Sequence, residues 1–86
     1  MIDGDHLLIV FNSIHRVMVA EMVLKKKFDI LVMPVPRAIS ADCGMVIRIS
    51  DNDCAAIIEV LQTKGLAPFS TYRLRGERFE LVGEFA

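Results

Sequence analysis

The sequence has few aromatic residues and almost no net charge. It contains no tryptophan and a single tyrosine, and its net charge is -1 at neutral pH. Proteins that bind nucleic acid or an anionic membrane surface usually carry a basic patch, which this charge does not indicate. An RNA-binding sheet would also need aromatic side chains on its central strands, and the segment 45–49 has none. We therefore expect no nucleic-acid partner and no membrane partner.

Long apolar runs and a set of cysteines are also missing. No run approaches the roughly 18 uncharged apolar residues of a membrane-spanning helix. The segment from Met1 to Asp5 is acidic and lacks the basic region of a secretory signal peptide. Two cysteines are too few for the disulfide framework of a small secreted protein. We expect a reduced, cytoplasmic protein.

Several short functional motifs are absent as well. The sequence has no CxxC, HExxH, GxGxxG or Walker loop. Its two cysteines and two histidines do not have the spacing of zinc ligands. We therefore expect neither a bound metal nor a cofactor.

The predicted elements describe one small domain over residues 1–86. The expected strands cover residues 6–11, 30–35, 45–49 and 69–75, and a short fifth strand covers 79–82. The expected helices cover residues 14–27 and a segment that starts with a near capping box at 50–53 and ends at Lys64. The order β-α-β-β-α-β predicts an α+β, ferredoxin-like sandwich, with residues 76–86 as an extra strand or tail.

The apolar content of 53% is high for a chain of 86 residues. Either nearly all apolar side chains are buried, or some of them face a partner. The first helix has a stripe at helical spacing that we expect to face the core: Ile14, Val17, Ala20, Leu24 and Phe28. Val19, Met22 and Val23 fall on the opposite side of the helix and predict a docking face, most simply in a homo-oligomer.

The segment between the second and third strands carries the best candidate for chemistry. Right-handed crossovers place this loop at the same end of the sheet as Ser13 and the start of the first helix. Cys43 can supply a thiolate, Gly44 allows close approach of a ligand or backbone, and Arg37 adds positive charge. The alternative is that Cys43 is only a small residue packed at a turn.

His15 and Glu21 each have two interpretations, and Cys54 has one. His15, in the first turn of the helix, either orients a group held by Cys43 or is simply solvated. Glu21 is either a flanking residue whose carboxylate reaches water or a buried acid paired with an arginine. Cys54 shares a helix face with Ile57 and Leu61, so we expect a core residue at the end of the sheet opposite Cys43.

The chain resembles the small bacterial family described as putative Se/S carrier protein-like. The resemblance covers about residues 8–66. The helix matches S-x-H-x4-A-E-x2-L-K at Ser13, His15, Ala20, Glu21, Leu24 and Lys25. The loop matches P-x-P-R-x-[IL]-S-x-x-C-G at Pro34, Pro36, Arg37, Ile39, Ser40, Cys43 and Gly44. The chain departs from the pattern at Val17, Phe28, Asp42 and the tail after Leu74, and the charge of Asp42 opposes a lowered thiol pKa.

The resemblance implies that Cys43 carries sulfur or selenium, with Ser13, His15, Arg37, Ser40 and Gly44 around it and more weight on Glu21. We expect a carrier that exchanges with a sulfur- or selenium-donor protein, rather than an enzyme with independent turnover. One alternative is a small-ligand-binding or regulatory module without thiol chemistry, in which the loop is only a tight turn near an anion site at the helix start. The other is a structural interaction domain that uses the docking face of the first helix.

Overall fold

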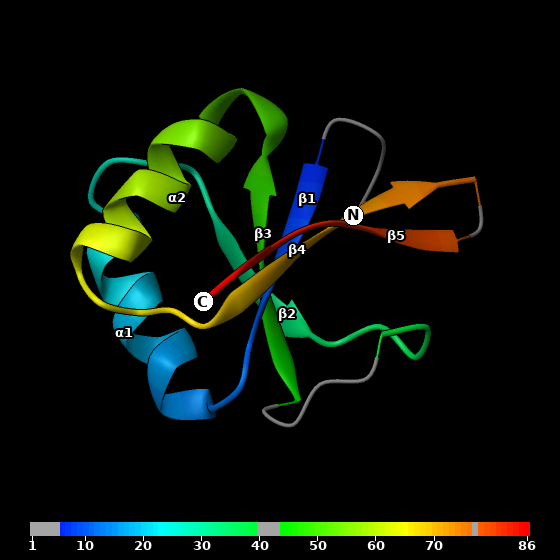
Figure 1. Cartoon of the computed structure of the whole chain (residues 1–86), viewed down its shortest axis with the longest axis horizontal. Helices are drawn as coiled ribbons and strands as arrows, with labels where there is room; N and C mark the ends of the chain where they lie inside the picture. The colour runs from blue at the N-terminus through cyan, green and yellow to red at the C-terminus, as the bar shows by residue number, and fades with distance from the viewer. Residues whose placement is uncertain (1–5, 40–43, 77) are drawn as a thin grey trace.

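The computed structural model describes residues 6–39, 44–76 and 78–86 (Figure 1). The elements in chain order are β1 (His6–Phe11), α1 (Ile14–Leu24), β2 (Leu31–Pro34), β3 (Met45–Ser50), the short 3₁₀ helix η1 (Asp51–Asp53), α2 (Cys54–Thr63), β4 (Phe69–Arg75) and β5 (Arg78–Phe85). The protein is therefore an α+β domain with a five-stranded sheet and two helices, and both helices lie on one side of the sheet.

The strands are antiparallel in the order β2-β3-β1-β4-β5. Since β3 lies between β1 and β2 and is antiparallel to both, β1 and β2 run in the same direction. This arrangement agrees with the crossover expected from the sequence.

The main core lies between the sheet and the helices. Its sheet side includes alternate residues of β1, namely Leu7, Ile9 and Phe11. Its helix side is formed by Val17, Ala20 and Leu24 of α1 and by Ile57 and Leu61 of α2. Because side chains alternate along a strand, the remaining residues of β1 must face the other side of the sheet.

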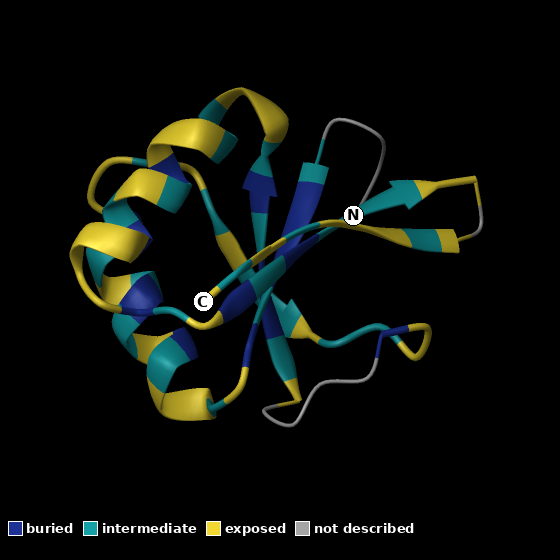
Figure 2. Cartoon of the chain, viewed as in Figure 1, coloured by how far each residue is buried: buried dark blue, intermediate teal, exposed yellow. Residues whose placement is uncertain are grey.

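A second, smaller cluster lies on that other side. It contains the buried side chains of Leu8, Val46 and Ile39. Ile39 belongs to the loop after β2, and this loop lies away from the helices (Figure 2). The prediction that the first strand is buried on both faces is confirmed, and the second cluster accounts for part of the high apolar content.

Helix α1 begins as expected but ends earlier. Ser13 is its N-cap, and the Ser13 hydroxyl accepts a hydrogen bond from the backbone N–H of Arg16 at 3.2 Å. The expected end was Lys27, whereas the helix ends at Leu24. The Leu24 carbonyl accepts from the N–H of both Lys27 and Phe28, so the chain tightens into a turn there.

The predicted faces of α1 need correction. Ile14, expected in the core, is 48% exposed. Val19, expected outside, packs against the main core, and Val23 lines a groove between the helices. Met22 is 60% exposed as expected, and Met18 is 59% exposed. The outward apolar residues are therefore Ile14, Met18 and Met22, which share one stripe at a spacing of four.

The start of α2 also differs from the sequence expectation. Neither Ser50 nor Asp53 makes a side-chain capping bond, and residues 51–53 form η1 in place of a capping box. Asp51 instead accepts a hydrogen bond from the Arg73 guanidinium at 2.7 Å. The expected end of the helix is confirmed, because Gly65 has φ +69° and its N–H donates to the Gln62 carbonyl.

Strand β5 is longer than the predicted segment 79–82 and contains a bulge. Thr71 pairs with Gly83 but Tyr72 pairs with Leu81, so Val82 is an extra residue. The bulge places Phe79 and Phe85 on opposite faces, although they are six positions apart, a spacing that would put them on the same face of a regular strand. Phe79 joins the second cluster, and Phe85 packs on the main core.

In the described part of the chain, no helix has the length and apolar character needed to cross a membrane.

Candidate functional site

One end of the sheet collects the segments that the sequence analysis singled out. Phe11, the last residue of β1, pairs with Phe69, the first of β4. Pro34, the last residue of β2, pairs with Met45, the first of β3. The β1–α1 turn, the β2–β3 loop and the segment before β4 therefore meet at this end, as the sequence predicted.

The described part of the β2–β3 loop is attached to the sheet at two points. The Val35 N–H donates to the Gly44 carbonyl at 3.0 Å, which extends the pairing of β2 with β3 by one step. The Ile39 N–H donates to the Pro36 carbonyl at 3.0 Å and closes a turn. The buried side chain of Ile39 then packs with Leu8 on the second face. The loop is thus held at its beginning, at its turn and at its return to the sheet.

The turn in this loop presents an exposed arginine. Arg37 and Ala38 are both exposed, between the anchoring residues Pro36 and Ile39. A guanidinium in this position can pair with an anionic group on a ligand or a partner protein. The predicted thiol and hydroxyl, Cys43 and Ser40, lie outside the described residues.

Gly44 has a specific backbone role. Its φ is +73°, a conformation that glycine adopts without the steric cost paid by other residues. A Cβ atom added there would meet none of the described residues within 4 Å. The glycine therefore meets a requirement of the backbone.

The start of α1 contributes a capped helix end with an exposed imidazole. Ser13 caps the helix, and His15 is exposed in its first turn. The N-terminus of a helix attracts anionic groups through its backbone N–H groups and its dipole. A thiolate or a persulfide anion placed at this end would be favoured by the same field.

Arg16 is a residue of this region that the sequence analysis did not select. Its guanidinium donates a hydrogen bond to the Ala67 carbonyl at 2.6 Å. The bond joins the first turn of α1 to the segment before β4, across 51 positions of the chain. No sequence signal could have found it, because the partner is a backbone carbonyl that is distant in the chain.

The predicted site residues reach this end from different sides. Ser13 and His15 belong to the helix layer, whereas Ile39 and the turn at Arg37 pack over the second face. His15 and Arg37 thus share an end of the sheet but approach it from opposite faces. Glu21 is half-buried and lies roughly 12 Å along the axis of α1 from Ser13, at about 1.5 Å per residue.

The second cysteine is remote from this end. Cys54 begins α2 next to the end of β3, and Ser50 there pairs with His6 at the far end of β1. Cys54 is half-buried and packs against the main core, which confirms the core assignment. Burial, and then the negative charge of Asp51, raises the pKa of the Cys54 thiol above its ordinary value of 9.0, and the positive charge of Arg73 opposes this. A thiol in this state is a poor nucleophile at neutral pH.

Among the described residues, no three histidine, cysteine, aspartate or glutamate side chains come together in a way that could hold a metal ion.

Comparison with known protein families gives a match over residues 6–73 to the family described as putative Se/S carrier protein-like. The chain belongs to this Se/S carrier-like family. The matched residues run from the start of β1 into β4 and include every residue proposed for the site. The suspected resemblance is thereby confirmed over a longer part of the chain than its motifs covered. No curated protein and no solved structure gives a significant match.

The family match ends before the last strand of the sheet. Strand β5 (Arg78–Phe85) lies wholly beyond the matched residues. Its Phe85 nevertheless stacks on Phe69 of the matched unit, with ring centroids 4.9 Å apart. In this Se/S carrier-like chain, β5 therefore extends the sheet at its β4 edge beyond the matched residues.

Proposed function

We propose that the protein carries sulfur or selenium as a persulfide or selenosulfide on Cys43. The observation that carries the proposal is the family match across residues 6–73, which includes the cysteine loop. The firm attachment of that loop through Val35, Ile39 and Gly44 supports it. The bond between Val35 and Gly44 fixes where the segment that carries the cysteine leaves and rejoins the sheet.

The proposed loading step needs no added oxidant or reductant, because the persulfide passes from the donor to Cys43 without net oxidation or reduction. The Cys43 thiolate attacks the terminal sulfur of a donor persulfide, forming a new S–S bond on Cys43 while the S–S bond of the donor breaks. The donor leaves as a thiolate, and Cys43 becomes the persulfide. The same exchange applies to selenium bound to a donor thiol. Delivery repeats the exchange with an acceptor thiolate, so the chain needs neither cofactor nor metal.

The residues around the loop receive proposed supporting roles. Arg37 pairs with the anion on the donor or with the persulfide, and Ser13 keeps the helix start in place at this end. His15 donates a hydrogen bond to the departing thiolate or to the held chalcogen. Gly44 keeps the backbone turn, while Ser40 and Glu21 are assigned to the site on the family pattern.

We also propose a fold class for the chain. We assign the first four strands and two helices to the ferredoxin-like sandwich, because β1, β3 and β4 are adjacent and β2 lies outside β3. In this assignment β5 is an extra edge strand on a single domain.

The proposed partners are a donor protein and a second copy of the chain. A carrier must meet a sulfur- or selenium-donor protein at the exposed Arg37 turn. Self-association is proposed through the stripe Ile14, Met18 and Met22, which replaces the face expected from the sequence. We place this chemistry in the cytoplasm, where a carrier thiol is kept reduced before loading.

Loading can be tested directly on the full chain. The protein is incubated with glutathione persulfide, or with the selenotrisulfide of glutathione, and intact masses are recorded after desalting. We expect one added sulfur from the persulfide and one added seleno-glutathione group from the selenotrisulfide, both absent in Cys43→Ser. The matched control Cys54→Ala should load like the original chain, because the Cys54 thiol has a raised pKa.

The pH dependence of Cys43 alkylation separates the carrier from its alternative. The measurement uses the Cys54→Ala background, with His15→Ala beside it. An apparent pKa well below about 8.5 supports an activated carrier thiol. If neither the persulfide nor the selenotrisulfide loads Cys43, and the pKa of its thiol is unperturbed, the carrier function is wrong. The small-ligand-binding or regulatory module then replaces it.

A further inference from the structure

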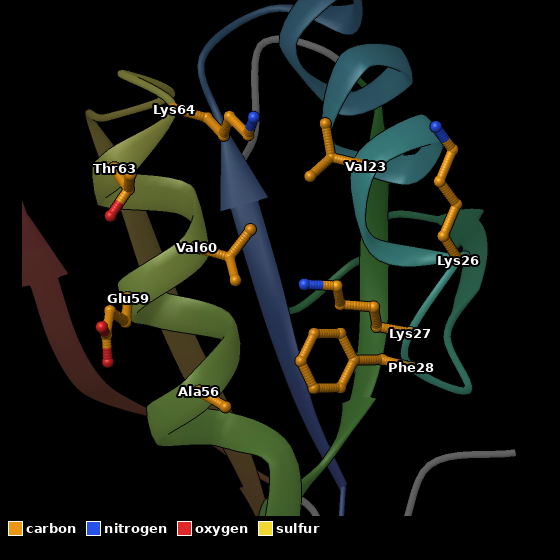
Figure 3. Close-up of a pocket in the computed structure, with 9 residues that line it drawn as sticks. All are labelled: Val23, Lys26, Lys27, Phe28, Ala56, Glu59, Val60, Thr63 and Lys64. Atoms are coloured by element: carbon orange, nitrogen blue, oxygen red, sulfur yellow. The ribbon is translucent and has the colours of Figure 1, made fainter.

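A groove lies between the two helices, on the face of the sheet opposite the cysteine loop. Its volume is about 600 Å³, within the range of small-molecule sites. Val23 and Phe28 line it from the end of α1, and Val60 lines it from α2 (Figure 3). Val60 and Phe28 are only half-buried although both pack against the main core. The floor of the groove is therefore an apolar surface left partly open.

Positive charge surrounds this apolar floor. Lys26, Lys27 and Lys64 line the groove, with Glu59 as the acidic residue among them. The whole chain has a net charge of -1, so the local excess of lysine is not a property of the protein at large. Favourable charge at the end of α1 accounts for lysines near its C-terminus but not for the open apolar floor beside them.

Two of the lysines are directed into the groove from the segments that follow the two helices. In Figure 3 the side chain of Lys27 extends toward the space between α1 and α2 beside Phe28, and the side chain of Lys64 extends toward it above Val60. In the same view, Lys26 and Glu59 are directed away from that space. Two ammonium groups that border the same apolar floor match a ligand with an anionic head and an apolar body.

We propose that this groove binds a small amphipathic anion, with a carboxylate or phosphate group between Lys27 and Lys64 and a short apolar body on Val23, Phe28 and Val60. A small molecule fits better than an acidic protein segment, because the groove has a volume of about 600 Å³, in the range of small-molecule sites, and both inward lysines line this one groove. The site goes beyond the proposed carrier function, since the cysteine loop packs on the other face of the sheet.

Binding can be measured with octyl phosphate and octanoate as probes. Amide ¹H–¹⁵N spectra of the full chain locate the site, and isothermal titration gives the affinity. We expect saturable shifts at residues 23–28 and 56–64 with both probes. Octanol, which lacks the charge, and inorganic phosphate, which lacks the apolar body, should each bind at least about tenfold more weakly.

Variants test the two halves of the site. Lys27→Gln with Lys64→Gln should weaken octyl phosphate binding about tenfold, because two partly exposed charge pairs are lost. Lys25→Gln is the matched control, since Lys25 is exposed just outside the groove, and it should leave binding unchanged. Ala56→Leu should narrow the groove and weaken both probes without removing a charge.

Three results would overturn the proposal. The first is equal binding of octanol and octyl phosphate, and the second is unchanged binding in the double lysine variant. The third is a glutamate-rich amphipathic peptide that shifts the same residues and binds more tightly than octyl phosphate, which would make the groove a protein-docking site. Loading of Cys43 is measured separately by mass, so failure here does not decide the carrier function.

Discussion

The guanidinium of Arg16 donates a hydrogen bond to the backbone carbonyl of Ala67 at 2.6 Å. It joins the first turn of α1, which carries His15, to the segment that leads into β4. Ser13 caps the same turn through the N–H of Arg16. The position of the candidate site's helix start is therefore set by one local bond and one long-range bond.

Removing the long-range bond should destabilise the domain. Arg16→Met keeps most of the aliphatic stem but leaves the partly buried Ala67 carbonyl without its charged donor. We expect the free energy of unfolding to fall by about 1–2 kcal/mol in urea denaturation. Arg37→Met, at an exposed arginine, is the control and should stay within about 0.5 kcal/mol of the original chain. If both variants lose the same unfolding free energy, the hydrogen bond from Arg16 to Ala67 does not stabilise the domain.

A substitution at Gly44 should lower the unfolding free energy only because of the backbone conformation at this position. Gly44→Ala forces a Cβ into a backbone with φ +73°, although none of the described residues lies within 4 Å of that Cβ. The expected loss is about 1 kcal/mol of unfolding free energy, and Gly44→Asn should lose less because asparagine tolerates this conformation better. If Gly44→Ala loses several times more unfolding free energy in the same denaturation series, the added Cβ must clash with a neighbouring group.

Cys54 should give the stability of the protein a specific pH dependence. Its pKa is raised in the folded state, first by burial and then by Asp51, so the folded chain holds the thiol proton more tightly than the unfolded chain. This contribution is fully present below the ordinary value of 9.0 and is lost as pH rises through the folded pKa. Unfolding free energies of the original chain and of Cys54→Ala, measured from pH 7 upward, should show a fall with pH that is smaller in the variant.

A second measurement on Cys54 separates the effects of the two charges that act on its pKa. Asp51→Asn removes one cause that raises the pKa, so alkylation of Cys54 at a fixed pH should become faster. Arg73→Gln removes the opposing cause and should slow it. Rates that do not move in these opposite directions would contradict the electrostatic part of the explanation.

The exposed stripe on α1 should control self-association. Met18→Glu with Met22→Glu places charge on two side chains that are 59% and 60% exposed. We expect a smaller assembly by light scattering coupled to size exclusion, with unfolding free energy changed by less than about 0.5 kcal/mol. Gln62→Glu, on the exposed side of α2, should leave the assembly unchanged. An original chain that is already monomeric at high concentration would end the proposal of self-association.

Sequence patterns predicted the elements well where they depend on local periodicity. The first strand was expected to be buried on both faces, and the alternation of Leu7, Leu8 and Ile9 between two clusters agrees with that. The N-cap at Ser13 and the glycine end of α2 were also predicted, because capping depends on residues a few positions apart. The position of Cys54 in the core followed from its spacing to Ile57 and Leu61.

Periodicity failed where two helices and a sheet compete for the same side chains. Ile14 falls on the apolar stripe of α1 but is exposed, since it lies in the first turn, beyond the cover of the sheet. Val19 was assigned outside, yet it packs on the core because α1 contacts both the sheet and α2. A helical wheel assumes that a helix has one buried face, so it cannot describe a helix that packs on both a sheet and a second helix.

The sequence by itself determined the order of the elements, the cap of α1 and the family motifs around Cys43, because these depend on residues that are neighbours in the chain. Only the tertiary structure decided the bond from Arg16 to Ala67, the bulge that places Phe79 and Phe85 on opposite faces, and the placement of Lys27 and Lys64 along one groove. Each of these joins segments that are remote in sequence or depends on the pairing register of a distant strand. Their positions follow from how the helices and strands pack, which no local pattern records.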